Sequence, residues 1–139
     1  MYRFVLIIIL SFVSIVSYSQ NNVDDIIGYY FCIDPFSGEK SQIEIYKSND
    51  EGTYNGKVVW IENVEKRKDE GYLFMHGLKF NEVKNEWQNG IIKYPGKIGT
   101  FDTYMFFVEK NKLEVRGYWK IVLLGKTMYW YKEKEKRKH

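Results

Sequence analysis

The sequence predicts an all-β domain, a small antiparallel barrel of about eight strands that follows an N-terminal signal peptide. Three observations favour it. Short runs of β-branched and aromatic residues follow one another after Asp25, separated by Gly, Asn, Asp and Lys. Turn residues recur about every 8 to 12 positions, without a helical periodicity longer than two turns, which is typical of a sandwich or barrel. The aromatic content of 18% supplies bulky side chains for one core.

The first residues, 1–19, have the pattern of a signal peptide. Arg3 precedes an apolar run from Phe4 to Val16, and small residues precede Gln20 at the positions that a signal peptidase reads. The run is short for a membrane span, and a retained anchor is the alternative. We therefore expect a periplasmic or secreted protein whose mature domain starts at Gln20.

The predicted domain, residues 20–132, divides into eight strands. The pattern is clearest where Ile43 and Ile45 alternate with Gln42 and Glu44, as in a half-buried strand. The predicted strands are 26–33, 41–47, 53–62, 72–80, 90–94, 103–109, 112–122 and 126–132. Turn or charged segments connect them at 34–38, 49–52, 65–70, 109–112 and 124–125, and 81–87 is expected to form a short turn of helix.

Three of the apolar segments do not alternate, namely 58–61, 105–108 and 121–124. An antiparallel strand with a wet outer face should alternate between apolar and polar side chains. We therefore expect the outside of the barrel to be covered in places by a loop, a partner chain or a ligand.

Charge and cysteine content exclude some classes of protein. The basic excess lies in Lys132–Lys138, which holds five bases and two acids, so that residues 133–139 are expected to form a solvated charged tail. Because no basic face interleaved with aromatic residues occurs within the domain, a nucleic-acid partner is not expected. Cys32 is the only cysteine, which excludes an intrachain disulfide, and in an apolar strand it is expected to be a small buried side chain.

No catalytic motif is present, and no catalytic residue, cofactor or metal site is predicted. The chain has no nucleophile elbow, Walker loop, dinucleotide fingerprint or zinc-protease motif. His76 and His139 are the only histidines, which leaves no multi-histidine metal site, and His139 lies in a segment expected to be disordered. The scattered carboxylates could meet in space, but the sequence does not pair them.

Aromatic and basic residues on strands are the candidate ligand-binding set. Arg116 shares a strand face with Glu114 and Tyr118. If this face points inward, Arg116 is a paired structural group or the polar anchor of a cavity, and otherwise it is an exposed arginine on the sheet. The aromatic side chains either fill the core or form the walls of a pocket. The candidate residues are Tyr30, Trp60, Trp87, Tyr104, Arg116, Tyr118, Trp119 and Trp130.

Five short segments, in order, resemble DUF2147, a family of small exported bacterial proteins without an established activity. They are Gly56-Lys-Val-Val-Trp60, Gly71-x5-Gly77-Leu78-Lys79, Trp87-Gln-Asn-Gly90-Ile-Ile, Lys112-Leu-Glu-Val-Arg-Gly-Tyr118 and Leu124-Gly-Lys-Thr127-x2-Trp130. The resemblance runs from about Ile27 to Lys132. The start of the first strand is also similar to lipocalin-type barrels, in which an aromatic residue closes the base, and this similarity implies a calycin-like barrel.

The chain departs from the family pattern at three places. Gly28-Tyr29-Tyr30 has tyrosine where the family has tryptophan, and Trp130-Tyr131-Lys132 has lysine in place of a stacked arginine. Lysine lacks the planar fork of arginine. Lys93-Tyr94-Pro95-Gly96-Lys97 lacks the acid that precedes proline in the family. If that acid is catalytic elsewhere, this chain does not share the activity, and if it caps a turn, little changes.

The leading hypothesis is an exported, non-enzymatic barrel that binds a small hydrophobic or lipid-like ligand in the cell envelope. The alternative is a protein–protein interaction module, in which outer apolar strands dock a partner or a second copy. A hydrolase is the third hypothesis, and it requires acids gathered around Arg116.

Overall fold

A computed structural model of the protein describes residues 21–139, so that the predicted signal peptide, residues 1–19, lies outside the described residues. A short 3-10 helix, η1 (Val23–Ile26), precedes the first strand, and a second one, η2 (Val64–Asp69), lies between the third and fourth strands. The strands are β1 (Gly28–Ile33), β2 (Lys40–Lys47), β3 (Thr53–Ile61), β4 (Leu73–Asn81), β5 (Glu86–Ile92), β6 (Phe101–Glu109), β7 (Lys112–Tyr118) and β8 (Gly125–Glu133).

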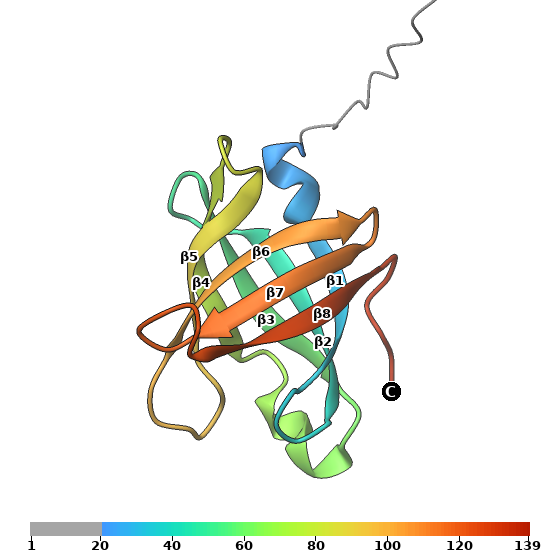
Figure 1. Cartoon of the computed structure of the whole chain (residues 1–139). Coiled ribbons are helices and arrows are strands. Elements are labelled where there is room, and N and C mark those ends of the chain that lie inside the picture. Colours follow the sequence, from blue (N-terminus) through green and yellow to red (C-terminus); the bar gives the residue numbers. More distant parts are fainter. Residues whose placement is uncertain (1–20) are drawn as a thin grey trace, which may run out of the picture.

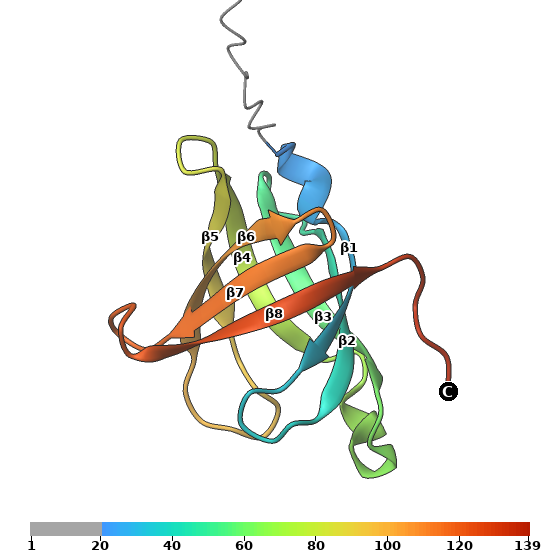
Figure 2. The same cartoon turned by 45° about the vertical axis from the view of Figure 1, so that its right-hand side comes forward.

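The eight strands form one closed antiparallel barrel, which confirms the predicted fold class (Figures 1 and 2). Each strand pairs with its neighbour in sequence, and β8 returns to β1, where Tyr30 lies opposite Lys132. A ring of this kind leaves no strand edge unpaired. Closure therefore fixes an inside and an outside for every strand.

The interior of the barrel is filled with apolar side chains. In β2, Ile43 and Ile45 are buried in the core as predicted, whereas Gln42, which was expected on the exposed face, is also buried. The middle of the barrel holds a set of side chains that are fully removed from solvent: Met75, Leu78, Met105, Leu113 and Val115. A barrel of eight strands is just wide enough for its side chains to fill it, and these residues do so.

One end of the barrel is closed by η1, the blue helix in Figure 1. Asn22 caps its start, and the side chain of Asp25 accepts a hydrogen bond from the backbone N–H of Asn22 in return. Three strands contribute donors to its carbonyl oxygens. These are Trp87 Nε1 to Val23 (3.1 Å), Lys132 Nζ to Asp25 (2.8 Å) and Tyr30 OH to Ile26 (2.8 Å).

Two departures from the family pattern, Tyr30 at the start of β1 and Lys132 at the end of β8, lie together at this closed end. Lys132 Nζ lies 6.0 Å from the centre of the Tyr30 ring and 5.9 Å from that of Phe107. The ammonium thus faces two aromatic rings and also reaches the Asp25 carbonyl, although it lacks the fork of an arginine. Partial burial lowers the pKa of Lys132 from its ordinary value.

The charged tail packs against the outer wall of the barrel instead of extending into solvent. Arg137 forms a two-pronged pair with Glu133 (2.7 and 2.8 Å). Its guanidinium also lies 4.5 Å from the centre of the Phe31 ring and 4.9 Å from that of Trp60. The buried amide of Gln42 donates to Glu133 and accepts from the Arg137 backbone. The tail is therefore the cover that the non-alternating segment 58–61 requires.

Two predicted elements are wrong in detail. Residues 81–87 form a turn followed by the start of β5, so that Trp87 lies in a strand and not in a helical turn. The strand predicted at 112–122 ends at Tyr118, and residues 119–124 form the β7–β8 loop. The backbone of this loop bonds to itself, from Trp119 N–H to the Leu124 carbonyl (2.9 Å), and this bond turns the chain before the apolar run can continue β7.

We expect the closed end to make the fold sensitive to alkali. Burial raises the pKa of Tyr30 above its ordinary value of 10. A group whose pKa is higher in the folded state stabilises the fold fully below its unfolded pKa, and that stabilisation is lost as the pH rises above about 10. Tyr30→Phe should therefore weaken the fall in unfolding free energy between about pH 8 and about pH 11.

The Tyr30→Phe variant should also be less stable by about 1 kcal/mol at neutral pH, because the Ile26 carbonyl loses its donor. Urea unfolding at both pH values measures the two effects. Tyr29→Phe, on the opposite face of the same strand, is the matched control. Equal alkaline losses in the parent and in Tyr30→Phe would contradict the assignment.

Candidate functional site

The end of the barrel opposite η1 is open, and we call it the mouth. It is surrounded by the β1–β2 loop (34–39), η2, the β5–β6 loop (93–100) and the β7–β8 loop (119–124), which gather at the lower end and lower left of Figure 1. Each connection at this end is longer than the β4–β5 and β6–β7 turns at the closed end. The long loops of the barrel and its mouth thus lie on one side.

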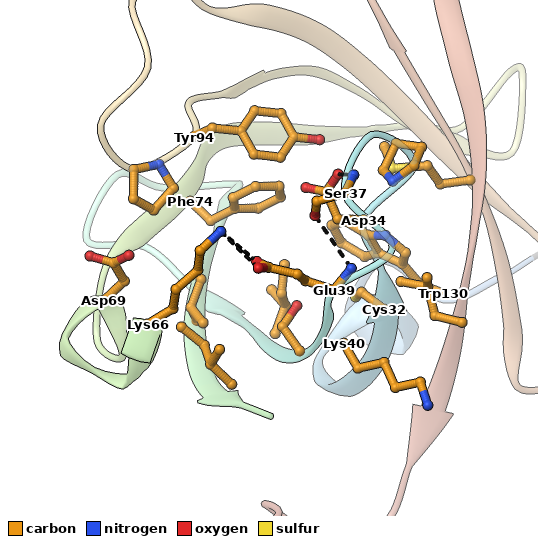
Figure 3. A pocket seen from close by; sticks show the side chains of 18 of the residues that line it. Cys32, Asp34, Ser37, Glu39, Lys40, Lys66, Asp69, Phe74, Tyr94 and Trp130 are labelled. Atoms are coloured by element: carbon orange, nitrogen blue, oxygen red, sulfur yellow. Dashed lines mark hydrogen bonds and ion pairs between the residues drawn. The ribbon is translucent and has the colours of Figure 1, made fainter. Parts of the chain in front are cut away.

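The mouth contains a cavity of about 200 Å³ with an apolar floor (Figure 3). The floor residues project from five strands, β1 to β4 and β8, because inward positions alternate along each strand. They are Cys32, Ile43, Val58, Ile61, Phe74, Met128 and Trp130. Phe74 packs edge-on against Tyr94, with ring centres 5.2 Å apart, and also contacts Trp130 at 6.1 Å.

The rim of this cavity is charged. Lys66 of η2 forms an ion pair with Glu39 of the β1–β2 loop (2.8 Å), and this pair crosses the rim in Figure 3. Asn63 also donates to Glu39 (3.3 Å). The Lys66 ammonium lowers the pKa of the Glu39 carboxyl from its ordinary value. Glu39 is thus occupied by protein partners and leaves other groups to meet a ligand.

Two donors in the mouth have no hydrogen-bond partner among residues 21–139. They are the hydroxyl of Tyr94 and the indole N–H of Trp130, and both residues line the cavity. Figure 3 shows the Tyr94 ring extended over Phe74, with its hydroxyl directed toward the loop that holds Asp34 and Ser37. Burial, and secondarily the charge of Asp34, raises the pKa of Tyr94, so that the hydroxyl stays protonated and can donate.

A second hollow of about 270 Å³ adjoins the first and shares Pro35, Tyr94 and Met128 with it. Its remaining walls include Phe36, Phe101 and Leu124. Lys97 Nζ lies 5.6 Å from the centre of the Phe36 ring and Lys126 Nζ lies 4.5 Å from it. This side of the mouth therefore combines aromatic walls with two lysines.

The structure separates the sequence-predicted ligand residues into different regions. Tyr30 and Trp87 are buried at the closed end, and Trp60 lies under the tail. Tyr104 and Tyr118 pack together on the outer face (ring centres 6.2 Å apart), and Trp119 lies in the β7–β8 loop, 55% exposed. Of the eight residues, Trp130 alone lines the cavity, and the ligand-binding role of all eight stays a prediction.

Arg116 lies on the outer face of β7 and holds the β7–β8 loop. Its Nε and Nη2 donate to the carbonyl oxygen of Val122 (3.1 and 2.7 Å), and its Nη1 donates to Thr127 Oγ1 (3.1 Å). The inward positions of β7 are taken by Leu113 and Val115. The face shared by Glu114, Arg116 and Tyr118 thus points outward, the exposed alternative of the sequence analysis.

Sequence reasoning missed most of the residues that line the mouth. Tyr94 stands in the noted segment 93–97, where the family pattern differs, and this was its one visible signal. Phe74 and Met128 occupy inward positions close to strand ends, which alternation can find only after the open end is known. Cys32 is buried as predicted, but at the floor of the cavity.

The described residues hold no group of three or more side chains placed to ligate a metal ion. No helix within residues 21–139 is long and apolar enough to cross a membrane. At the mouth, this part of the chain presents an apolar floor, a charged rim and the donors of Tyr94 and Trp130.

Comparison with known proteins agrees with this architecture. The model of a family described as "Uncharacterized protein conserved in bacteria (DUF2147)" matches residues 28–132. No curated protein matches the chain. Among solved structures, the chain is similar to HP1028 from the human pathogen Helicobacter pylori, a protein of the lipocalin family. The TM-score is 0.64 at 18% identity, over 78% of this chain and 83% of that one, and this likeness shows a lipocalin-like fold.

We expect Cys32 to react slowly with thiol reagents in the folded protein. Burial, and secondarily the charge of Glu133, raises the pKa of the Cys32 thiol well above its usual range, and the thiolate is the reactive form. Labelling with a disulfide reagent at neutral pH should be slow in the native state and fast in urea. Cys32→Ala is the control for background reaction. If the native protein were labelled as fast as the protein in urea, the Cys32 thiol would be accessible in the folded state, and the prediction would be wrong.

Proposed function

This chain belongs to the DUF2147 family, and from this premise we propose that its barrel binds a small amphipathic molecule in the mouth without converting it. The observation that carries the proposal is the combination of an apolar floor with the unpartnered donors of Tyr94 and Trp130. Both residues line the cavity, so that an acceptor on a ligand can take the hydrogen bonds that no described protein group accepts. The lipocalin-like fold supports a ligand-binding role.

The charges at the mouth indicate the chemistry of the ligand's polar end. Asp34 accepts from the backbone N–H groups of Phe36 (2.7 Å) and Ser37 (3.0 Å), and Glu39 is paired with Lys66. Lys97, in contrast, contacts aromatic rings and has no carboxylate partner among the described residues. Asp69 of η2 also lines the cavity, but the donors of Tyr94 and Trp130 lie with Lys97 in the same lining. We therefore propose a head group that accepts hydrogen bonds, such as a carboxylate.

The volume of the mouth limits the ligand's apolar part. The cavity over the floor, at about 200 Å³, is smaller than the roughly 300–1,000 Å³ of pockets that enclose a drug-sized molecule, and the adjoining hollow adds about 270 Å³ to its side. Below the floor, Met75 and Met105 are fully buried and leave no path through the barrel. The ligand therefore places a ring or the end of an acyl chain on the floor, and the rest of it lies at the rim.

Binding of cis-parinaric acid, a fluorescent fatty acid, tests this proposal with its methyl ester as the matched probe. The parent protein should bind the acid saturably. Tyr94→Phe removes one donor and should weaken binding of the acid by about five- to tenfold, the equivalent of one hydrogen bond. Binding of the ester should change less. Met128→Trp fills both hollows and should abolish binding of both probes.

Val83→Trp is the matched control, because Val83 is 96% exposed in the turn at the closed end. It should bind both probes like the parent. Thermal unfolding of each variant shows whether it is folded. Unchanged binding in a folded Met128→Trp variant, or no saturable binding by the parent, would refute a ligand site in the mouth.

We also propose that the domain acts in the cell envelope or outside the cell, with residues 1–19 removed on export. The support is the sequence pattern of Arg3 followed by the apolar run 4–16. Expression of the full chain in a bacterial host should give an envelope or medium fraction whose intact mass begins at Gln20. A membrane-fraction protein that keeps Met1 would instead identify a retained anchor.

A further inference from the structure

The β7–β8 loop exposes an uninterrupted apolar run beside the mouth. Ile121 is 54% exposed, Val122 44%, Leu123 85% and Leu124 54%. Contiguous exposed apolar residues of this kind mark an interaction site, since isolated ones are common but runs are not. Figures 1 and 2 show the loop, in red, projecting away from the barrel, so that it forms a tip and not a flat face.

Four carbonyl oxygens of this loop accept hydrogen bonds within the protein, which lowers the cost of entering an apolar medium. The carbonyls of Trp119, Ile121 and Leu124 accept from backbone N–H groups at 2.8, 2.9 and 2.9 Å. The Val122 carbonyl accepts twice from Arg116. A carbonyl without a hydrogen-bond donor is very costly in hydrocarbon. These bonds therefore lower the free-energy cost of bringing the loop into the bilayer interface.

The charges around the loop favour an anionic surface. Lys120 and Lys126 flank the apolar run, and the sequence has no Asp or Glu between Glu114 and Glu133. The β5–β6 loop adds Lys93 and Lys97, together with the fully exposed Ile98.

Phe36 joins these loops on one side of the mouth. Its ring contacts both Lys97 and Lys126, and it lines the second hollow together with Leu124. The acidic residues that line the cavity belong to other segments, Asp34 and Glu39 to the β1–β2 loop and Asp69 to η2.

We propose that the β7–β8 loop inserts into the interface of an anionic lipid bilayer and holds the mouth of the barrel against the membrane. Ile121 and Leu123 enter the acyl boundary, Trp119 lies at headgroup level where tryptophan is enriched, and the lysines contact anionic headgroups. A bilayer fits a protruding apolar tip with a lysine at either side, whereas a protein partner would require a complementary pocket. This proposal does not depend on the mouth being a ligand site.

Vesicle flotation tests the proposal with residues 21–139, which contain every strand and the whole core. This unit omits the apolar run 4–16, which would bind vesicles by itself. The protein should bind vesicles of phosphatidylcholine mixed with phosphatidylglycerol more tightly than vesicles of phosphatidylcholine alone. Ile121→Ser combined with Leu123→Ser should weaken binding at least about tenfold. Lys120→Gln and Lys126→Gln should each weaken binding to the anionic vesicles about fivefold and leave binding to the neutral vesicles unchanged.

Tryptophan fluorescence gives a second readout. Trp119 is the one exposed tryptophan among the described residues, since Trp60, Trp87 and Trp130 are buried. Anionic vesicles should shift the emission to the blue in the parent, and Trp119→Phe should remove the shift without unfolding the protein.

The control is Val83→Ser combined with Lys84→Gln, an equivalent change at the exposed turn of the closed end, which should leave vesicle binding intact. Circular dichroism and thermal unfolding confirm that each variant is folded. Absence of vesicle binding by the folded parent, or equal binding by the Ile121→Ser, Leu123→Ser variant, would overturn the proposal. A loop-dependent dimer in sedimentation without vesicle binding would also overturn it, and would assign the loop to a second copy of the chain.

Discussion

Donors from three strands meet the carbonyl oxygens of one short helix at the closed end of this barrel. Trp87, Lys132 and Tyr30 come from β5, β8 and β1, and each bonds to η1. The Tyr30 bond is buried and the Trp87 bond is partly buried, so that leaving either of them unmade is costly. Tyr54 adds a further bond to Asp24 of the helix (2.6 Å). With one end sealed in this way, access to the interior is confined to the mouth, and the long loops there become the place for function.

The mouth combines two kinds of surface that serve different ends. Its floor is apolar and small, and its rim carries paired charges, of which Glu39 and Lys66 are the best defined. The β7–β8 loop beside it is apolar, exposed and flanked by lysine. If that loop rests on a bilayer, an amphipathic molecule can move between the lipid and the mouth without crossing much water, so that the two proposals describe one path. Each still stands or falls by its own experiment.

Strand order and alternation could be predicted from the sequence, because a strand's period of two is written directly in residues such as Ile43 and Ile45. The period of two shows only which residues share a face of the strand. Which face points inward depends on closure of the ring. For this reason the sequence alone did not decide whether Arg116 points into the barrel or away from it. Apart from Lys120, residues 119–122 are apolar and partly β-branched, as in a strand, although they form a loop. The tail is a further case, because charge alone does not reveal that Arg137 can stack between Phe31 and Trp60.

Pairing of β1 with β8 also has a consequence for how the chain folds. Tyr29 lies opposite Glu133, so that the two partners are separated by nearly the whole domain. Contacts between residues this far apart are slow to form, because a long loop must be closed first. During synthesis one side of β1 therefore stays without a partner until β8 has emerged, and it is then an edge that other chains can join. Aggregation of this protein should accordingly begin from incomplete chains or late intermediates and not from the closed barrel.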